Sequence, residues 1–212
     1  MNIVSVITAR GGSKGIPKKN IIDINGKPLI WYSINASLNS NVNETWVSTE
    51  DDNIKRVSQD CGANVIDRPS ELSDDIIMPD AALVHFAQDH DFDILVFIQP
   101  TSPLIKPEYI NAGIDLLINN THDSCFAAVK EHWLPRWDKN INPIDWSIQD
   151  RPRRQDRPDR YVEAGMFYIT TRDGLLKSKL RYSGSIGIVQ IPLIDSVDIN
   201  SYEDLELVRK LI

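Results

Sequence analysis

Two hydrophobic patterns alternate along the chain. Short, largely apolar runs, typical of strands buried on both faces, occur at residues 3–7, 45–48, 64–66, 93–98, 124–129, 166–169 and 186–191. The intervening segments repeat apolar residues at helical spacing, and the residues that can begin these helices are Pro28, Asp51 or Asp52, Pro79, Pro107 and Ser201. Run 93–98 is the clearest central strand. This alternation predicts an α/β fold, a mostly parallel sheet with helices on both faces.

The periodic pattern fails between Lys130 and about Asp159. This stretch holds Trp133, Trp137 and Trp146 together with several Pro and Arg residues. The tryptophans fit either an interface anchor or ordinary core packing. A chain of 212 residues with 42% hydrophobic residues suits one compact domain. We therefore expect a single domain over residues 1–212, with a protruding arm at about 130–160.

Composition narrows the classes of partner. The net charge of −7 argues against non-specific binding of nucleic acid, so an anionic substrate would need a local basic pocket. The two cysteines and four histidines lack metal-binding spacing, and no apolar stretch is long enough to span a membrane. The apolar run at the N-terminus is too short for a signal peptide. These features predict a soluble, cytoplasmic protein with no nucleic-acid or membrane partner.

The loop after the first strand carries the most chemistry. Ligands of parallel sheets bind at the carboxyl ends of strands, which directs attention to the loops after Ile7, Ile66 and Ile98. Residues 9–20 read Ala-Arg-Gly-Gly-Ser-Lys-Gly-Ile-Pro-Lys-Lys-Asn. The glycines leave backbone N–H groups open to phosphate oxygens, and the basic side chains can neutralise a polyphosphate. The loop is neither a P-loop nor the dinucleotide fingerprint, and an exposed turn with solvated lysines is the alternative.

Three further segments have a chemical and a structural reading. Gln99 closes the central strand, and the Pro-Thr-Ser-Pro turn behind it could be purely structural. The basic run 151–160 could be a solvated arm or a nucleic-acid patch, although its two aspartates and the acidic chain weaken the second reading. Alternation puts Asp198 and Asn200 on one face, where their oxygens could hold Mg²⁺. Asp198 could instead only position the last helix.

Five segments in order resemble the CMP-sialic acid synthetases, also called N-acylneuraminate cytidylyltransferases. They are the loop 9–20, Val-Ser-Thr-Glu at 47–50, Arg-Pro-Ser-Glu-Leu at 68–72, Gln-Pro-Thr-Ser-Pro at 99–103, and Arg-Arg-Gln-Asp at 153–156 ahead of Gly-Met-Phe-Tyr at 165–168. The resemblance runs from residue 3 to about residue 210. It implies a Rossmann-like nucleotidyltransferase fold and a homodimer in which the irregular arm embraces a second subunit.

The resemblance also implies a role for each matched position. Nucleotide binding would fall to Ala9, Arg10, Gly11, Ser13, Asn20 and Arg68. The sugar would be bound by Gln99, Arg153, Arg154, Gln155 and Tyr168. Catalysis would rest on Arg10, Lys19, Arg153 and Asp198, and Mg²⁺ on Asp198 and Asn200. Arginine suits the carboxylate of an acid sugar because its planar fork can bind both oxygens.

Three departures from the family pattern bear on the substrate and the metal. The family commonly has Asp where Asn200 stands, Asn or Glu-Asn where Glu163 and Ala164 stand, and Arg where Ile105 stands. The first leaves the number of metals open. The other two lie near the expected sugar, so they leave its identity open.

The resulting hypothesis is a cytidylyltransferase that uses CTP, Mg²⁺ and an acidic sugar. The anomeric hydroxyl of a sialic acid-type nonulosonate would attack the α-phosphate of CTP, giving a CMP-sugar and pyrophosphate. One rival is the same reaction on legionaminate, pseudaminate, Kdn or Kdo. A sugar-1-phosphate nucleotidyltransferase would share the first loop but needs no carboxylate clamp. A nucleotide-binding relative without catalysis is the third rival, and Asn200 is the feature that favours it.

Overall fold

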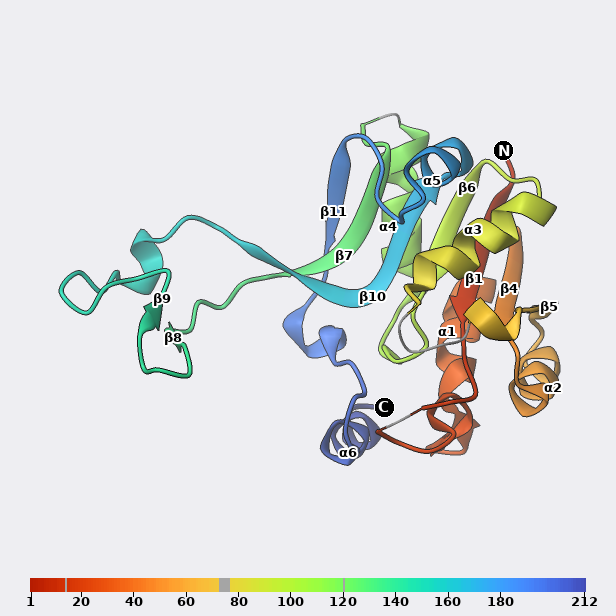
Figure 1. Ribbon diagram of the computed structural model, residues 1–212, viewed down its shortest axis with the longest axis horizontal. Helices are drawn as coiled ribbons and strands as arrows, with labels where there is room; N and C mark the ends of the chain where they lie inside the picture. The colour runs from red at the N-terminus through yellow and green to blue at the C-terminus, as the bar shows by residue number, and fades with distance from the viewer. Residues whose placement is uncertain (14, 73–76, 120) are drawn as a thin grey trace.

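A seven-stranded sheet forms the centre of the computed structural model, which describes residues 1–13, 15–72, 77–119 and 121–212 (Figure 1). Its order is β11-β7-β10-β6-β1-β4-β5. The strands are β1 (Ile3–Thr8), β4 (Glu44–Thr49), β5 (Asn64–Asp67), β6 (Ile94–Ile98), β7 (Ser124–Lys130), β10 (Tyr161–Thr171) and β11 (Ile186–Gln190). Only β10 runs antiparallel to its neighbours, β6 and β7, among these pairs. The predicted mostly parallel sheet, with β6 at its middle, is confirmed.

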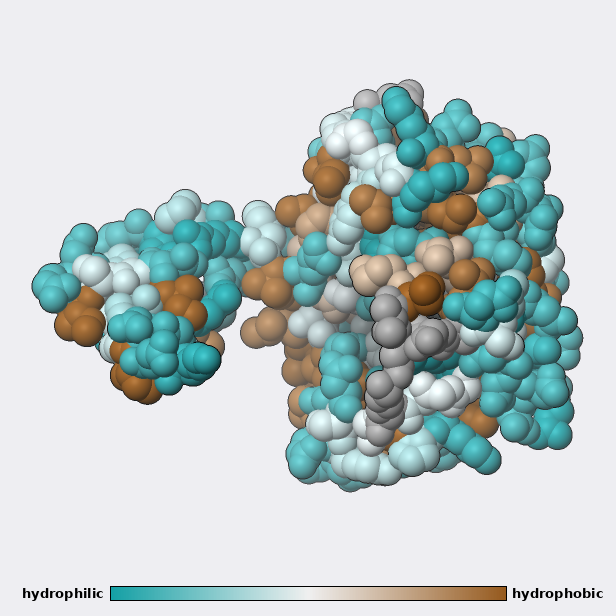
Figure 2. All heavy atoms as spheres, in the orientation of Figure 1, coloured by the Kyte–Doolittle hydropathy of each residue, from teal (hydrophilic) through white to brown (hydrophobic). Residues whose placement is uncertain are grey.

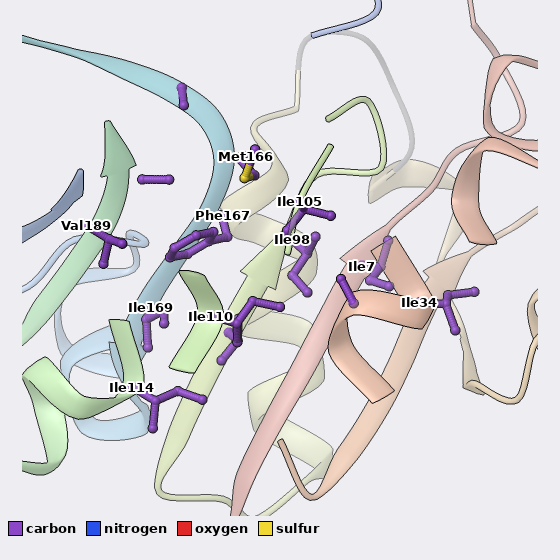
Figure 3. Packing of buried hydrophobic residues seen from close by; sticks show 14 of the residues in the cluster. Ile7, Ile34, Ile98, Ile105, Ile110, Ile114, Met166, Phe167, Ile169 and Val189 are labelled. Atoms are coloured by element: carbon purple, nitrogen blue, oxygen red, sulfur yellow. The ribbon is translucent and has the colours of Figure 1, made fainter. Parts of the chain in front are cut away.

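Helices cover both faces of this sheet because each buried strand turns apolar side chains to both sides. On β1, Ile3 and Ile7 belong to one buried cluster and Val4 and Val6 to another. The first cluster, shown in Figure 3, packs the sheet against α1 (Leu29–Leu38), α2 (Asp52–Asp60) and α4 (Pro107–Ile118). The second packs it against α3 (Pro79–Asp89) and α5 (Arg172–Ser178).

The last helix, α6 (Tyr202–Leu211), packs beside the first loop at the end of the sheet (Figure 1). Ser201 and Asp204 form the predicted capping box at its start. A third cluster joins these distant parts of the chain; its fully or nearly fully buried members are Ile16, Ile24, Leu29, Ile199, Leu205 and Val208. Residues from both ends of the sequence therefore meet at the carboxyl ends of the strands.

The irregular segment forms an arm that projects away from the sheet (Figure 1). Strands β7 and β10 lead into it, pairing as far as Tyr161 opposite Lys130. It contains the short strands β8 (Arg136–Trp137) and β9 (Pro143–Ile144) and the 3₁₀ turn η3 (Arg154–Asp156). Figure 2 shows it as a separate lobe joined to the body by a neck.

The three tryptophans of the arm do not pack as one cluster. The rings of Trp137 and Trp146 meet edge to face with centroids 5.0 Å apart. The Arg157 guanidinium lies over Trp133, 4.7 Å from its centroid. These contacts stabilise the arm from within.

Two elements of the structure go beyond the sequence-based expectation. Helix α5 lies in a stretch for which no helix is predicted, and the strands β2 (Asp23–Ile24) and β3 (Lys27–Pro28) form a hairpin around Asn25 and Gly26. Both turn residues have positive φ, which is the conformation that an Asn-Gly hairpin turn uses. In the described ranges, no helix is both long enough and apolar enough to cross a membrane.

Candidate active site

A cavity of about 540 Å³ opens at the carboxyl ends of β1 and β6, within the size range of ligand pockets. It is lined by Thr8, Arg10, Ser13, Gly15, Lys19, Asn20, Arg68, Leu72, Ile77, Met78, Pro79, Gln99, Pro100, Thr101, Asp198 and Asn200. These residues come from the first loop, from the loops after β5 and β6, and from the segment before α6. Eight of the residues predicted for the site lie here: Arg10, Ser13, Lys19, Asn20, Arg68, Gln99, Asp198 and Asn200.

Glycines in the first loop let other backbone and side-chain groups approach closely. A Cβ on Gly11 would lie 2.6 Å from Asp51 Oδ2, and one on Gly15 would lie 2.9 Å from the Asn200 carbonyl oxygen. The Gly11 N–H donates to Glu50 Oε1 at 2.8 Å. This N–H is therefore engaged within the protein, whereas the sequence suggested that it stood open to phosphate. The role of Gly11 in nucleotide binding stays a prediction.

Glu50 also orients one of the three cations that line the cavity. Its other carboxylate oxygen accepts a hydrogen bond from the Arg68 guanidinium at 2.8 Å. Arg68 is buried, so this charge-assisted bond fixes its direction. One carboxylate at the end of β4 thus holds both the first loop and Arg68 in place.

Lys19 lies at the start of the 3₁₀ turn η1 (Lys19–Ile21), and its position is set by the far end of the chain. Its ammonium donates to the Ile199 carbonyl oxygen at 2.7 Å. Burial lowers the pKa of Lys19, with Asp198 opposing that effect and Arg10 adding to it. A partly desolvated ammonium interacts more strongly with a phosphate than a solvated one, because water screens it less.

The remaining residues predicted for the nucleotide also lie near the first loop. The buried Asn20 side chain donates to the Arg10 carbonyl oxygen at 2.9 Å, which closes the loop on itself. Ala9 is fully buried, and its N–H donates to the Ser48 carbonyl oxygen at 3.0 Å. Ala9 therefore fixes the start of the loop beside β4, and among the described residues it does not line the cavity.

Asp198 and Asn200 have the chemistry that a divalent cation needs. The Asn200 side-chain amide donates to Asp198 Oδ2 at 2.8 Å, so the two side chains lie together as predicted. Asp198 Oδ1 is buried and, within the described part of the chain, has no hydrogen-bond partner. A buried carboxylate oxygen without a partner costs free energy, which a bound cation would offset. The described residues hold no cluster of three or more His, Cys, Asp or Glu, but Mg²⁺ commonly takes one or two carboxylates plus phosphates and water.

Tyr168 belongs to the second buried cluster and is not among the described residues that line the cavity. Its ring is buried and stacks on Phe97 with centroids 5.8 Å apart, and its hydroxyl donates to Glu163 Oε2 at 3.0 Å. Burial raises the pKa of Tyr168, and the Glu163 carboxylate adds to this. Gln99 does line the cavity, and Gly165 leaves room for it: a Cβ there would lie 3.2 Å from Gln99 Oε1. Contact between Tyr168 and a sugar stays a prediction.

Arg153, Arg154 and Gln155 lie on the arm, outside the lining of the first cavity in the described ranges. Arg153 Nε pairs with Asp156 Oδ2 at 2.8 Å. Arg154 and Gln155 line a second cavity of about 490 Å³, whose other walls include Lys130, His132, Trp133 and Arg157. Within one chain, then, the structure does not bring the predicted carboxylate clamp to the candidate nucleotide site.

Several lining residues were not predicted from the sequence. Thr8 is the last residue of β1 and Thr101 lies in the loop after β6, where the rule for parallel sheets could have found them. Met78 and Pro79 stand at the start of α3, and the helix-starting proline is their one signal in the sequence. The described part of the lining combines the cations Arg10, Lys19 and Arg68 with the carboxylate of Asp198, which suits an anionic ligand such as a polyphosphate.

In a comparison with protein-family models, the model for cytidylyltransferases matches residues 4–163. Among relatives, N-acylneuraminate cytidylyltransferase B of Danio rerio is 36% identical over 204 residues, covering 92% of this chain and 48% of that protein. The chain thus spans about half the length of this relative. Pseudaminic acid cytidylyltransferase of Campylobacter jejuni is 31% identical, covering 100% of this chain and 96% of that protein.

Solved structures share the fold. The structure of CMP:2-keto-3-deoxy-manno-octonic acid synthetase complexed with CTP superposes with a TM-score of 0.76 at 21% identity, covering 100% of this chain and 98% of that one. A 4-diphosphocytidyl-2C-methyl-D-erythritol synthase from Anaerococcus prevotii gives a TM-score of 0.69 at 12% identity, covering 99% of this chain and 97% of that one. The Rossmann-like nucleotidyltransferase fold is therefore confirmed.

Proposed function

The chain belongs to the cytidylyltransferase family, and we propose that it transfers CMP from CTP to the anomeric hydroxyl of a sialic acid-type nonulosonate. The products are a CMP-sugar and pyrophosphate. The observation that carries the proposal is the cavity at the ends of β1 and β6, where Lys19, Arg10 and Arg68 line the same space as Asp198. Relatives named for N-acylneuraminate and for pseudaminic acid support an acid sugar as the acceptor.

In the proposed reaction, the anomeric oxygen forms a bond to the α-phosphorus of CTP and the α–β bridging P–O bond breaks. Lys19 and Arg10 neutralise the charge that grows on the phosphate oxygens, which is the work of preorganised donors in phosphoryl transfer. Asn20, Arg68 and Gln99 hold the nucleotide and the sugar in position. The Asp198 carboxylate accepts the proton of the attacking hydroxyl.

Mg²⁺ is part of this proposal, with Asp198 and Asn200 as the residues that would hold it. Asp198 Oδ1, which is buried and has no hydrogen-bond partner among the described residues, supports that choice. When bound, Mg²⁺ supplies charge neutralisation at the phosphates and lowers the pKa of a hydroxyl beside it.

The sugar site is proposed to be completed by a second copy of the chain. The arm carries Arg153, Arg154 and Gln155 away from the cavity of their own chain, and exposed apolar side chains on the arm include Leu134, Trp137, Ile144 and Ile148. A homodimer in which each arm reaches the partner's cavity would bring the carboxylate clamp to the sugar. We also propose that the enzyme works in the cytoplasm, where its substrate CTP is made.

The reaction is tested by pyrophosphate release from CTP and Mg²⁺ with a panel of acceptors: N-acetylneuraminate, pseudaminate, legionaminate, Kdn, Kdo and hexose-1-phosphates. We expect release with one nine-carbon acid sugar. Pseudaminate is the second candidate, because the Campylobacter relative named for it matches this chain over its whole length. Release only with a hexose-1-phosphate would overturn the proposal. So would the absence of release with every acceptor while CTP still binds.

The arm in trans is tested by mixing two variants, each of which should have low activity at a sugar concentration well below the wild-type KM. Lys19→Ala removes a cavity residue and Arg154→Ala an arm residue, so a mixed dimer would contain one site with neither change. Light scattering should give the mass of a dimer, and co-refolding the two variants should restore up to about a quarter of wild-type activity, because half of the dimers are mixed and each has one intact site of two. A monomer, or a mixture no more active than its parts, would contradict the arrangement.

A further inference from the structure

A buried carboxylate three residues before Asp198 has no role in the site described so far. Asp195 lies in the 3₁₀ turn η4 (Leu193–Ser196) and is 7% exposed. Its Oδ2 accepts a hydrogen bond from Lys106 Nζ at 2.8 Å and another from the Tyr109 hydroxyl. Lys106 and Tyr109 belong to the start of α4, and in the described ranges none of the three residues lines the cavity.

This carboxylate remains charged although it is buried. Burial by itself would raise the pKa of Asp195, but the hydrogen bonds from Lys106 and Tyr109 outweigh it and hold the pKa below its ordinary value. The hydrogen bond to Asp195 is also the main reason that the pKa of Lys106 is raised. Asp195 thus makes a charged, hydrogen-bonded anchor to α4.

The chain beyond Asp195 is fixed at its other end as well. The Ile199 N–H donates to the Thr101 carbonyl oxygen at 2.9 Å, and the Ile199 side chain is fully buried in the third cluster. The Asn200 N–H donates to Asp204 Oδ2 at 3.0 Å, at the start of α6. Only residues 196–198 lie between the anchors at Asp195 and Ile199. Three residues span at most about 10 Å, so these anchors leave Asp198 little freedom to move.

Two groups of the candidate active site depend on this one segment. Asp198 places beside the cavity a buried carboxylate oxygen that has no hydrogen-bond partner in the described ranges. The next residue, Ile199, offers the carbonyl oxygen that accepts the Lys19 ammonium at 2.7 Å. A shift of residues 195–200 would therefore move the candidate metal ligand and the candidate catalytic ammonium together.

We propose that Asp195 is a positioning residue, which through Lys106 and Tyr109 clamps residues 195–200 to α4 and so sets the place of Asp198 for a divalent cation and CTP. This inference rests on the proposed function in that CTP is the ligand whose binding the cation assists. Removing a residue that orients a metal ligand without binding the metal itself typically lowers metal affinity or activity by about 10–100-fold.

The test measures how strongly Mg²⁺ assists the binding of CTP, which needs no sugar and no turnover. Calorimetry gives the Kd of CTP in EDTA and in saturating Mg²⁺, and the ratio of the two is the metal enhancement. We expect Asp195→Ala to lower this ratio by about tenfold while changing the Kd in EDTA much less. Asp195→Asn and Tyr109→Phe, which keep part of the hydrogen bonding, should give smaller losses in the same direction.

A double-mutant cycle separates positioning from general loss of structure. If Asp195 acts through Asp198, Asp195→Ala should lower the metal enhancement in the wild-type background. In an Asp198→Ala background the same change should alter the enhancement by less than about twofold. Asp123→Ala is the matched control, because Asp123 also joins two distant segments, accepting from the Ser185 N–H at 2.7 Å and the Ser185 hydroxyl at 3.0 Å. This control lies just before the start of β7, which runs parallel to β6, so it stands at the opposite end of the strands from the cavity and should leave the ratio unchanged.

Three results would overturn the inference: an unchanged enhancement in Asp195→Ala, an equal loss in the Asp198→Ala background, or an equal loss in the Asp123→Ala control. Measuring every variant well below its melting temperature keeps unfolding out of the comparison, and Tyr109→Phe gives the answer if Asp195→Ala does not fold. Wild-type protein that fails to bind CTP at all would overturn the proposed function as well. Normal metal-assisted binding without turnover would overturn only the proposed reaction.

Discussion

The body of the molecule and the arm both carry basic side chains, but they hold them differently. In the body, the Arg68 and Glu50 side chains pair at 2.8 Å with only 5% and 23% of their surfaces exposed. On the arm, the Arg153 and Asp156 side chains pair at the same distance with 75% and 47% exposed. The buried pair is shielded from water and has one geometry, whereas the exposed pair is screened and exchanges its partner at little cost.

This difference suggests a division of work between the body and the arm. Charges fixed by the ends of a sheet can be complementary to a transition state, because they need no rearrangement when the reaction occurs. Exposed arginines on a projecting arm suit the recognition of a carboxylate after the partner or the sugar has arrived. The body should therefore control the rate, and the arm should control the affinity for the sugar.

Removing the Lys19 side chain is the strongest test of this division of work. We expect Lys19→Ala to lower kcat by roughly a hundredfold or more, the scale of losing one transition-state donor. Single-turnover measurements with saturating CTP and sugar would check this. Near-normal turnover would show that Lys19 is not a catalytic residue. It would also contradict the expectation that the body controls the rate.

Arg153→Ala makes the same comparison from the arm. We expect the KM of the sugar to rise about tenfold, the scale of losing a hydrogen bond between charged groups, while the KM of CTP stays unchanged. Little stability should be lost, since the Arg153–Asp156 pair is exposed. Steady-state kinetics with each substrate varied in turn would show it. An unchanged KM for the sugar would exclude Arg153 from the carboxylate clamp.

Asn200→Asp sharpens the account of the metal. The new carboxylate would face Asp198, so Mg²⁺ should bind more tightly and half-maximal activity should need severalfold less of it. Without metal the two carboxylates would repel each other, and the melting temperature in EDTA should fall below that of the wild type. Superimposable Mg²⁺ titrations of the two proteins would show that residue 200 is not a ligand.

The smallest expected effect is the alkaline limb of the pH profile. Lys19 acts as a cation, and its lowered pKa means that it loses its proton at a lower pH than an ordinary lysine does. Activity should fall as pH rises, reaching roughly half at the pH that equals the folded-state pKa. Desolvation of the charged form also destabilises the fold below that pKa, so the contribution of Lys19 to stability should improve as pH rises through it. In Lys19→Arg the activity limb should vanish, because a guanidinium keeps its proton.

Much of the sheet could be predicted because its buried strands are short apolar runs with clear helix-starting residues between them. Asp51, for example, caps α2 through hydrogen bonds from Asn53 and Ile54, as its place after β4 indicated. Helix α5 was missed because seven residues are too few for a periodic pattern, and Gly174 weakens it further. The β2–β3 hairpin was missed although Asn25 and Gly26 carried its turn signal.

The site was predicted less completely than the sheet, for a physical reason. Motif residues such as Lys19 and Asp198 stand out by type and place, and the structure does bring both to one cavity. The acidic residues that hold the surroundings of the site in place do not stand out: Glu50 and Asp195 form bonds with residues far along the chain. The burial of Tyr168 depends on which face of β10 it occupies. The sequence predicts only residues 166–169 of this strand, which has 11 residues, so its neighbours in the sheet could not be inferred.

The bond between Lys19 and Ile199 joins residues 180 positions apart, which matters while the protein is being made. At synthesis rates of 5–20 residues per second, roughly 9–36 s pass between the appearance of the two residues on the ribosome. During that time Ile16, Ile24 and Leu29 lack Ile199, Leu205 and Val208, the other half of their buried cluster. The growing chain therefore presents an incomplete nucleotide loop with uncovered apolar surface. Nucleotide that binds only the finished cavity would favour completion of folding after synthesis, so CTP is expected to stabilise the finished state.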